Sequence, residues 1–193
     1  MAKVTAPLFS LKASGQLAKT LVYLNWKGIE DVRQYVIPTN PNTAGQQAQR
    51  GYMSAAVNAW HIDGYTAADV AAWNLYALAQ KVAASGFNMF TRFYVLAKVA
   101  AHTWTKLINC LISAIAATTA TVTITVASDQ TGILYVGTSK TSMLTQFTGA
   151  FLTDHYTFSL TGLVASTKYY FYIKNTAASE DARTGIYSFT TTA

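Results

Sequence analysis

The sequence predicts an α+β protein: an N-terminal β-hairpin with two or three α-helices, followed by an all-β sandwich. Three patterns predict this fold. Extended segments meet at Lys27-Gly28, a turn sequence that fits a hairpin. Downstream, helix-start signals precede apolar residues spaced three or four apart. In residues 119–127, Val and Ile alternate with Thr, as in a half-buried strand, and later segments continue this pattern between Gly, Ser, Asp and Asn clusters.

The segment after the hairpin predicts a rigid connector into the first helix. Pro38 and Pro41 forbid continued strand pairing, and Pro41 restricts Asn40 to extended geometry. Thr43 followed by Gln46 fits a capping box, in which the hydroxyl accepts from a free helix amide and the glutamine reaches back. We therefore assign these residues structural roles in a hinge that orients the first helix.

Two more helices are expected. Thr66 with Asp69 is a second start signal, for a helix that we expect to stop at Ser85-Gly86. Asn88 could cap a third helix. Small alanine side chains on these helices would let them pack closely.

Trp60 and Trp73 are the structural aromatic residues of this helical part. Burying a large side chain contributes roughly 1.5–3 kcal/mol, so the N-terminal half could fold alone. We expect a linker near residue 104 that separates a docking module, residues 1–104, from a sandwich, residues 105–193.

The chain carries few charges for its size. Hydrophobic residues make up 51% of it and charged residues 11%, against roughly 25% charged in typical soluble domains. Such a chain either hides surface against copies of itself or a partner, or has a surface rich in Thr and Ala. The apolar run at residues 107–117 is shorter than the roughly 20 residues of a spanning helix, so no membrane segment is predicted.

Residues that could carry catalysis or bind a metal ion are scattered. His61, His102 and His155 lie far apart, and most acids fall in turns or at helix starts. His61 and Asp63 could begin a metal site, but such a site needs three or four ligands. Cys110 lies in an apolar run, as a buried small hydrophobe does. We predict no catalytic residues, no metal site, no cofactor and no enzymatic activity.

Basic residues interleaved with aromatic ones give the candidate partner-binding residues Lys19, Lys27, Arg33, Arg50 and Trp26. Such residues can track phosphates and stack bases, but spaced charges are equally typical of a solvated sheet face or a protected edge. We therefore rank nucleic-acid binding below a solvated or partner-facing surface. Arg33 and Arg50 could bind a neighbouring subunit's carboxylate or brace the hairpin against the helix, and bracing is slightly favoured.

The C-terminal half resembles the final strands of a fibronectin type III domain. "SLTGLVASTKYYFYIKN" and "GIYSFTT" carry the resemblance, with Leu163 and Tyr169 at the corner where the family's tyrosine hydroxyl ties a loop to the sandwich. Ala165 replaces the usual proline, and Val126 stands where a core tryptophan is common. The resemblance covers about residues 107–193 and implies a fold, without a ligand.

Tyr170 and Tyr172 face outward if Tyr169 takes the corner. Two exposed tyrosines at alternate positions could bind a protein or a host-surface glycan. In most sandwiches such residues instead pack on the threonines of a neighbouring strand. Both interpretations stay open for this pair.

A second resemblance spans about residues 15–95. It is carried by a spaced set of residues and motifs: Arg33, "IPTNPNT", Gln46 or Gln47, Arg50, Trp60, Trp73 and "SGFNMF". The set resembles a module in uncharacterised proteins encoded by tailed bacteriophages and prophages. That resemblance implies a virion or virion-associated structural protein, on which a fibronectin-like sandwich would decorate an exposed surface.

The two resemblances together lead to one functional expectation. We expect a non-enzymatic virion protein, made in the host cytoplasm, that docks on the capsid as a decoration or cement protein and projects its sandwich. Its expected partners are the major capsid or tail protein and copies of itself, with a host-surface glycan as a further candidate. The alternatives are a tail or fibre-attachment protein, a cell-surface adhesion module and, ranked last, a DNA-binding protein.

Overall fold

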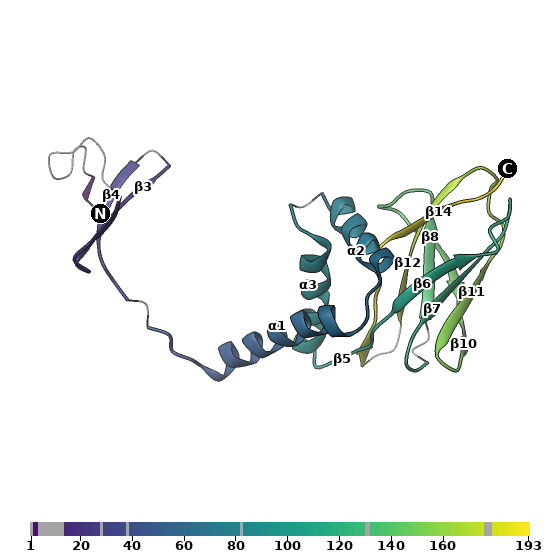
Figure 1. The fold of residues 1–193 in the computed structure, drawn as a ribbon, viewed down its shortest axis with the longest axis horizontal. Helices are drawn as coiled ribbons and strands as arrows, with labels where there is room; N and C mark the ends of the chain where they lie inside the picture. The colour runs from purple at the N-terminus through teal and green to yellow at the C-terminus, as the bar shows by residue number, and fades with distance from the viewer. Residues whose placement is uncertain are drawn as a thin grey trace. The chain divides into compact units, whose positions relative to one another are not determined.

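The computed structural model divides the chain into two compact units, Met1–Thr43 and Ala44–Ala193 (Figure 1). This division differs from the predicted boundary between residues 104 and 105, because the hairpin lies in one unit while the helices share the other with the sandwich. At four positions, Ala2, Lys3, Trp26 and Glu30, only the backbone is described. The structure describes residues 2–3, 14–27, 29–37, 39–81, 83–129, 132–175 and 179–193.

The first unit is an antiparallel sheet with the strand order β1-β4-β3-β2. Its strands are β1 (Ala2–Lys3), β2 (Gly15–Leu17), β3 (Leu21–Trp26) and β4 (Ile29–Gln34). The predicted hairpin is formed by β3 and β4, which pair along their whole length. Gly28, expected to supply a positive φ in the turn, lies outside the described residues, and Lys27 beside it has a φ of 52°.

The connector after β4 has no regular secondary structure in its described residues. Asn40, Pro41 and Thr43 lie in it, whereas Pro38 lies outside the described residues. Helix α1 (Ala44–Ile62) begins directly after Thr43, where the start signal places it, and Gln46 lies in its first turn.

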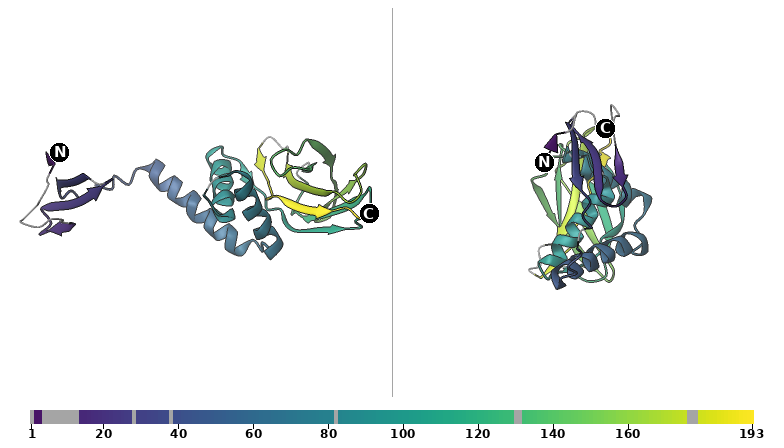
Figure 2. Two further views of the ribbon diagram at one scale, coloured as in Figure 1. Left: turned by 90° about the horizontal axis from the view of Figure 1, so that it is seen from above. Right: turned by 90° about the vertical axis from the view of Figure 1, so that its left-hand side faces the viewer.

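Helices lie beside the two sheets of a sandwich in the second unit (Figures 1 and 2). After α1 come α2 (Ala67–Ala79) and α3 (Gly86–Val99). The predicted capping box at the start of α2 is present. Thr66 N–H donates to Asp69 Oδ2 (2.8 Å), and Asp69 N–H donates to Thr66 Oγ1 (3.3 Å).

The turn between α2 and α3 differs from the sequence prediction. α2 ends at Ala79, earlier than expected, and Ser85 rather than Asn88 caps α3, because Asn88 N–H donates to Ser85 Oγ (3.3 Å). Gly86 allows the close approach of the two helices, since a Cβ there would lie 2.5 Å from Asn74 N. The Ser-Gly pair that we assigned to a helix end therefore begins the next helix.

Two four-stranded antiparallel sheets follow, with the orders β10-β11-β7-β6 and β14-β12-β8-β9. A short parallel pair, β5 (Thr103–Trp104) with β13 (Glu180–Asp181), lies outside them. The chain is therefore a mixed α+β protein built mostly of antiparallel β-sheets. The strands of the two sheets are β6 (Ile108–Ser113), β7 (Ala120–Thr125), β8 (Gly132–Gly137), β9 (Thr145–Thr148), β10 (Ala150–Leu152), β11 (His155–Leu160), β12 (Lys168–Asn175) and β14 (Tyr187–Thr190).

The core of the sandwich consists of residues that alternate along its strands. Val122, Ile124 and Val126 are at most 1% exposed, as the alternation in residues 119–127 predicts. Phe158 and Phe171, from the two different sheets, are fully buried. Each such side chain contributes roughly 1.5–3 kcal/mol by its removal from water, so the sandwich has a core of its own.

α2 packs directly on this sandwich. It contacts β6 and β14, and Ile186 N–H donates to Ala72 O (2.9 Å). Gly185 makes the approach possible, because a Cβ at this position would overlap the backbone of Ala72 and Trp73. The helices and the sandwich are therefore parts of one compact unit.

A buried carboxylate ties α2 to two strands. Asp69 is 1% exposed. Its Oδ1 accepts from the Tyr187 hydroxyl of β14 (2.6 Å), and its Oδ2 accepts from Asn109 N–H of β6 (2.9 Å) in addition to Thr66. A buried polar group is tolerated when hydrogen bonds satisfy it in this way. The residue predicted as a local helix cap therefore also joins α2 to the sandwich.

Candidate functional site

The described side chains of the first unit are exposed to an unusual extent. Every described side chain in residues 14–43 is half-buried or exposed. Large aliphatic side chains are widely exposed: Leu17 46%, Leu21 37%, Ile29 51%, Val36 69% and Ile37 72%. Large exposed apolar patches on a protein surface mark interaction sites.

Strand register gathers part of this apolar surface on one face of the sheet. Leu17 lies opposite Leu21, and Tyr23 lies opposite Val32. Directly opposite residues and alternate residues along a strand share a face. Leu17, Leu21, Tyr23 and Val32 therefore form one contiguous patch, which we call the apolar face.

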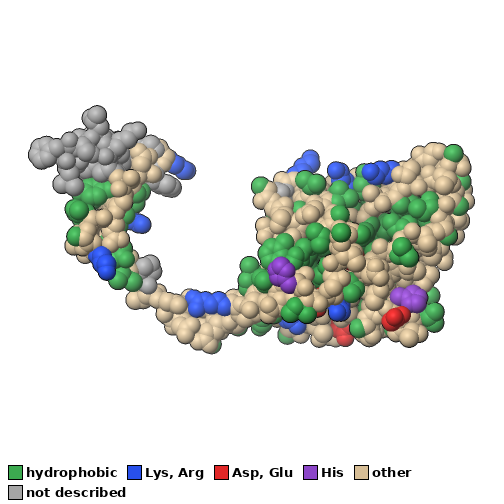
Figure 3. All heavy atoms as spheres, viewed as in Figure 1, with side chains coloured by type: hydrophobic (Ala, Val, Ile, Leu, Met, Phe, Trp, Pro, Cys, Tyr) green, Lys and Arg blue, Asp and Glu red, His purple; other side chains and the backbone are tan. Residues whose placement is uncertain are grey.

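The structure separates the basic residues that the sequence grouped as partner-binding candidates. Lys19 and Lys27 are exposed in the turns that flank β3, and Arg33 is exposed on β4 opposite Val22, on the face away from the apolar face. Lys and Arg side chains are visible at the surface of this unit in Figure 3. Arg50 lies in α1 of the second unit and is exposed. Bracing between the hairpin and α1 stays a prediction.

The structure describes the side chains of the two helix tryptophans, whereas the side chain of Trp26 lies outside the described residues. Trp60 stacks on Tyr65 with ring centroids 5.5 Å apart, and Trp73 meets Phe90 edge to face at 5.6 Å. Both helix tryptophans therefore lie within the aromatic cluster of the helices, in structural positions.

Tyr169 lies where the corner pattern places it. Its hydroxyl accepts a hydrogen bond from Val164 N–H (2.9 Å), which ties the loop before β12 to that strand. Leu163 beside this loop is 7% exposed. The side chain of Tyr169 itself stacks on Phe189 of β14 at 5.8 Å.

Tyr170 and Tyr172 do not form the exposed patch that the sequence left open. Tyr170 packs against the helix cluster. Tyr172 stacks on Tyr135 with centroids 4.9 Å apart, and the Arg183 guanidinium lies 4.8 Å from its ring. Both tyrosines are half-buried because the chain's own helices and neighbouring rings cover the outer face of β12.

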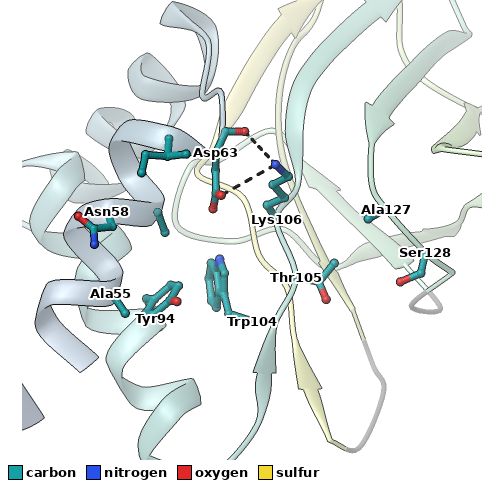
Figure 4. Close-up of a pocket in the computed structure, with 11 residues that line it drawn as sticks. Ala55, Asn58, Asp63, Tyr94, Trp104, Thr105, Lys106, Ala127 and Ser128 are labelled. Carbon is teal, nitrogen blue, oxygen red and sulfur yellow. Dashed lines mark hydrogen bonds and ion pairs between the residues drawn. The ribbon is translucent and has the colours of Figure 1, made fainter. Parts of the chain in front are cut away.

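A cleft of about 550 Å³ opens between α1, α3, the segment that leads into the sandwich and the loop after β7 (Figure 4). Tyr94 and Trp104 form an aromatic wall, with ring centroids 5.7 Å apart. Lys106 reaches across to Asp63, donating to its carbonyl oxygen (3.3 Å) and approaching its carboxylate (3.9 Å). The lining residues are Ala55, Asn58, Ala59, Ile62, Asp63, Tyr94, Trp104, Thr105, Lys106, Ala127 and Ser128.

Burial affects the tyrosines at and near this cleft. Burial raises the pKa of Tyr94, and the negative charge of Asp63 adds to the effect. Burial also raises the pKa of Tyr65, behind Trp104, far above its usual value. Neither His nor Cys is among the described residues that line the cleft. The cleft can offer a carboxylate, an ammonium group and two aromatic rings to a polar ligand.

Among the described residues, neither a cluster of metal ligands nor a thiol of low pKa is present. Within that part of the chain, no three His, Cys, Asp or Glu side chains lie close enough to hold a metal ion. Burial raises the pKa of the Cys110 thiol above its usual range, which disfavours the reactive thiolate. None of the described helices is long and apolar enough to cross a membrane.

Comparisons with known proteins give no family for the chain. No protein-family model matches it, and no curated protein matches it. One similar solved structure is a computationally redesigned β-sandwich protein (26% identity, TM-score 0.35, 46% of this chain and 95% of that chain). Another is the cell-surface chitinase ChiW from Paenibacillus sp. str. FPU-7 (13%, 0.36, 46% and 8%). A third is the sensor domain of the anti-sigma factor RsgI4 from Pseudobacteroides cellulosolvens (16%, 0.31, 46% and 93%).

Proposed function

We propose that the chain is a non-enzymatic structural protein of a bacteriophage virion, which docks through its first unit and presents its second unit. Capsid decoration or cementing is the leading role, and attachment to the tail or a fibre is the alternative. The phage assignment rests on the resemblance of the Asn-Pro connector and the following helices to phage-encoded modules. The docking assignment rests on the physical difference between the two units.

The observation that carries the docking role is the lack of buried side chains in the described part of the first unit. Its described side chains include none that is buried, whereas the second unit buries complete side chains in the sandwich and among the helices. Segments below about 40–60 residues rarely bury enough apolar surface to be stable without an additional source of stabilisation. A partner surface laid on the apolar face would supply that missing burial.

The net charge of the first unit indicates what kind of partner would bind it. Residues 1–43 hold five Lys or Arg against two acids, a formal charge of +3. An acidic surface with exposed apolar residues complements the unit, and a capsid or tail protein of that chemistry is the partner that we propose. Contacts between copies of this chain would be secondary, because two such units repel each other.

The sandwich fits the part of such a protein that faces outward. Its strand orders and the hydrogen bond from Val164 N–H to the Tyr169 hydroxyl support the finer proposal of a fibronectin type III-like domain. Because the helix cluster covers Tyr170, and Tyr135 and Arg183 pack on Tyr172, a host-surface glycan would need another surface. A cell-surface adhesion module remains the alternative from a different class of protein.

Co-sedimentation with capsids of the phage that encodes the chain tests the proposal. The test variant is Leu21→Asp, which places a charge on the apolar face. Its matched control is Gln16→Asp, which adds the same charge to the opposite face, since Gln16 pairs with Val22. We expect the wild type and Gln16→Asp to sediment with capsids and Leu21→Asp to lose most of this binding.

Two results would overturn the docking role. One is capsid binding that Leu21→Asp leaves unchanged. The other is binding to bare DNA that falls steeply with salt, because neutralising several phosphates makes affinity strongly salt-dependent. The second result would move DNA binding, ranked last from the sequence, to first place.

A further inference from the structure

Arg183 occupies an unusual position in the second unit. Its guanidinium carbon lies 4.8 Å from the ring centroid of Tyr76, 4.6 Å from Phe93 and 4.8 Å from Tyr172. Cation–π attraction operates within about 6 Å, so rings from α2, α3 and β12 hold this cation in place. The rings fix its orientation, and they supply no negative charge.

A second cation lies directly beside it. Lys174 and Arg183 are opposite each other in an antiparallel bridge, and directly opposite residues share one face with Cβ atoms about 5 Å apart. Like charges in this arrangement are destabilising unless something neutralises them. The pair therefore destabilises the fold, and a bound counter-ion would offset this effect.

No described acid forms an ion pair with either Arg183 or Lys174. The carboxylate of Asp181 is paired instead with His102, with its Oδ2 3.0 Å from Nδ1. Arg183 Nε is buried without a hydrogen-bond partner among the described residues, so the rings around this guanidinium do not satisfy all of its donors.

Both cations line one pocket of about 330 Å³, together with Asp181 and an apolar wall. Phe93, Leu96 and Ala97 of α3 belong to this wall, and Leu96 is 52% exposed. The pocket therefore places two cationic side chains beside an apolar surface of α3 that is partly exposed. A ligand with an anionic group and a short apolar chain would bind both the two cations and the apolar wall.

We propose that this pocket binds a small organic carboxylate, whose oxygens accept from Arg183 Nη and Lys174 Nζ while its apolar body lies against α3. An arginine fork suits a planar carboxylate, and lysine adds a point charge. The inference concerns the second unit alone and is independent of docking by the first unit. Its failure would therefore leave the proposed function untouched.

Titration of the full chain with hexanoate, followed by amide NMR, tests the proposal. We expect saturable shifts at residues 93–104 and 181–183, with a Kd on the order of 1 mM. Hexanol, which lacks the charge, and acetate, which lacks the apolar body, should each bind roughly tenfold more weakly. Equal binding of hexanol, or no saturable shifts, would overturn the proposal.

A pair of lysine variants makes the test specific. Lys174→Gln removes the exposed cation of the pocket, and we expect roughly fivefold weaker hexanoate binding. Lys168→Gln removes a lysine from the same strand and face that does not line the pocket, so its affinity should match the wild type. Arg183→Lys keeps the charge but loses the fork and should weaken binding roughly tenfold. Unchanged affinity in Lys174→Gln would also overturn the proposal.

Discussion

The two units use the same backbone geometry but differ in what holds them together. β3 and β4 in the first unit pair in continuous register, as β12 and β8 do in the second. The second unit adds buried side chains between its sheets, whereas the described part of the first unit has none. Hydrogen-bonded pairing contributes little net stability without side-chain burial, since the unfolded chain bonds to water. The difference teaches that regular strands do not by themselves make an independent domain.

The largest effect should come from emptying the core of the second unit. Phe171→Ala removes a fully buried ring and should lower the free energy of unfolding by roughly 3–5 kcal/mol. The paired substitution Leu21→Ala, in the first unit, should change it by less than about 0.5 kcal/mol, because Leu21 is 37% exposed. Urea unfolding followed by tryptophan fluorescence measures both, and equal losses would break the comparison.

The next largest loss of stability should come from the contact between α2 and the sandwich, which the hydrogen bonds of Asp69 form. We call this contact the joint. Asp69→Asn replaces an acceptor of several hydrogen bonds with a group that presents an amide donor to the Tyr187 hydroxyl or to backbone N–H groups. We expect a loss of about 2–3 kcal/mol. Asp154→Asn, at an exposed acid in the same unit, is the control and should unfold like the wild type. A stable Asp69→Asn variant would show that the carboxylate does not hold the joint.

Alkaline pH should weaken the same joint. Burial raises the pKa of Tyr187 far above the usual value of 10, and the negative charge of Asp69 adds to this. The folded state therefore keeps a proton that the unfolded chain loses above its pKa of about 10, so stability is unaffected below that pH and falls above it. Tyr187→Phe should reduce this fall by up to about 1.4 kcal/mol per pH unit in urea unfolding between about pH 9 and 11. Identical pH slopes would refute the assignment.

The smallest effect should come from the corner of the sandwich. Tyr169→Phe removes the acceptor of the Val164 N–H and keeps the ring against Phe189. We expect a loss of about 1 kcal/mol. Thermal unfolding can measure it against Tyr23→Phe in the first unit, which should leave the transition in place. A larger loss in Tyr23→Phe would contradict the assignment of stability to the second unit.

Local patterns in the sequence predict the helices and strands of the chain well. The alternation of residues 119–127 yields β7, and the Thr66–Asp69 signal yields the capping box of α2. The turn before α3 was harder to predict, because Ser85 competes with Asn88 for the same capping role. Both residue types cap helices, and local sequence alone does not decide between them.

Contacts between distant parts of the chain could not be predicted in this way. The hydrogen bond between Asp69 and Tyr187 joins residues far apart in sequence, and the close approach of Gly185 to Ala72 leaves no local pattern. These contacts place the helices on the sandwich and cover Tyr170. They explain why the two units differ from the predicted boundary and why the exposed tyrosine patch, one of two interpretations that the sequence left open, does not form. The three-ring environment of Arg183 depends on the same packing.

Amide hydrogen exchange on the free chain and on the chain bound to capsids tests the central claim most directly. Exchange reports local opening, element by element. We predict fast exchange in β3 and β4 of the free chain, strong protection of the same strands on the particle, and slow exchange in α2 and β12 in both states. Protection of β3 and β4 in the free chain equal to that of β12 would contradict the account.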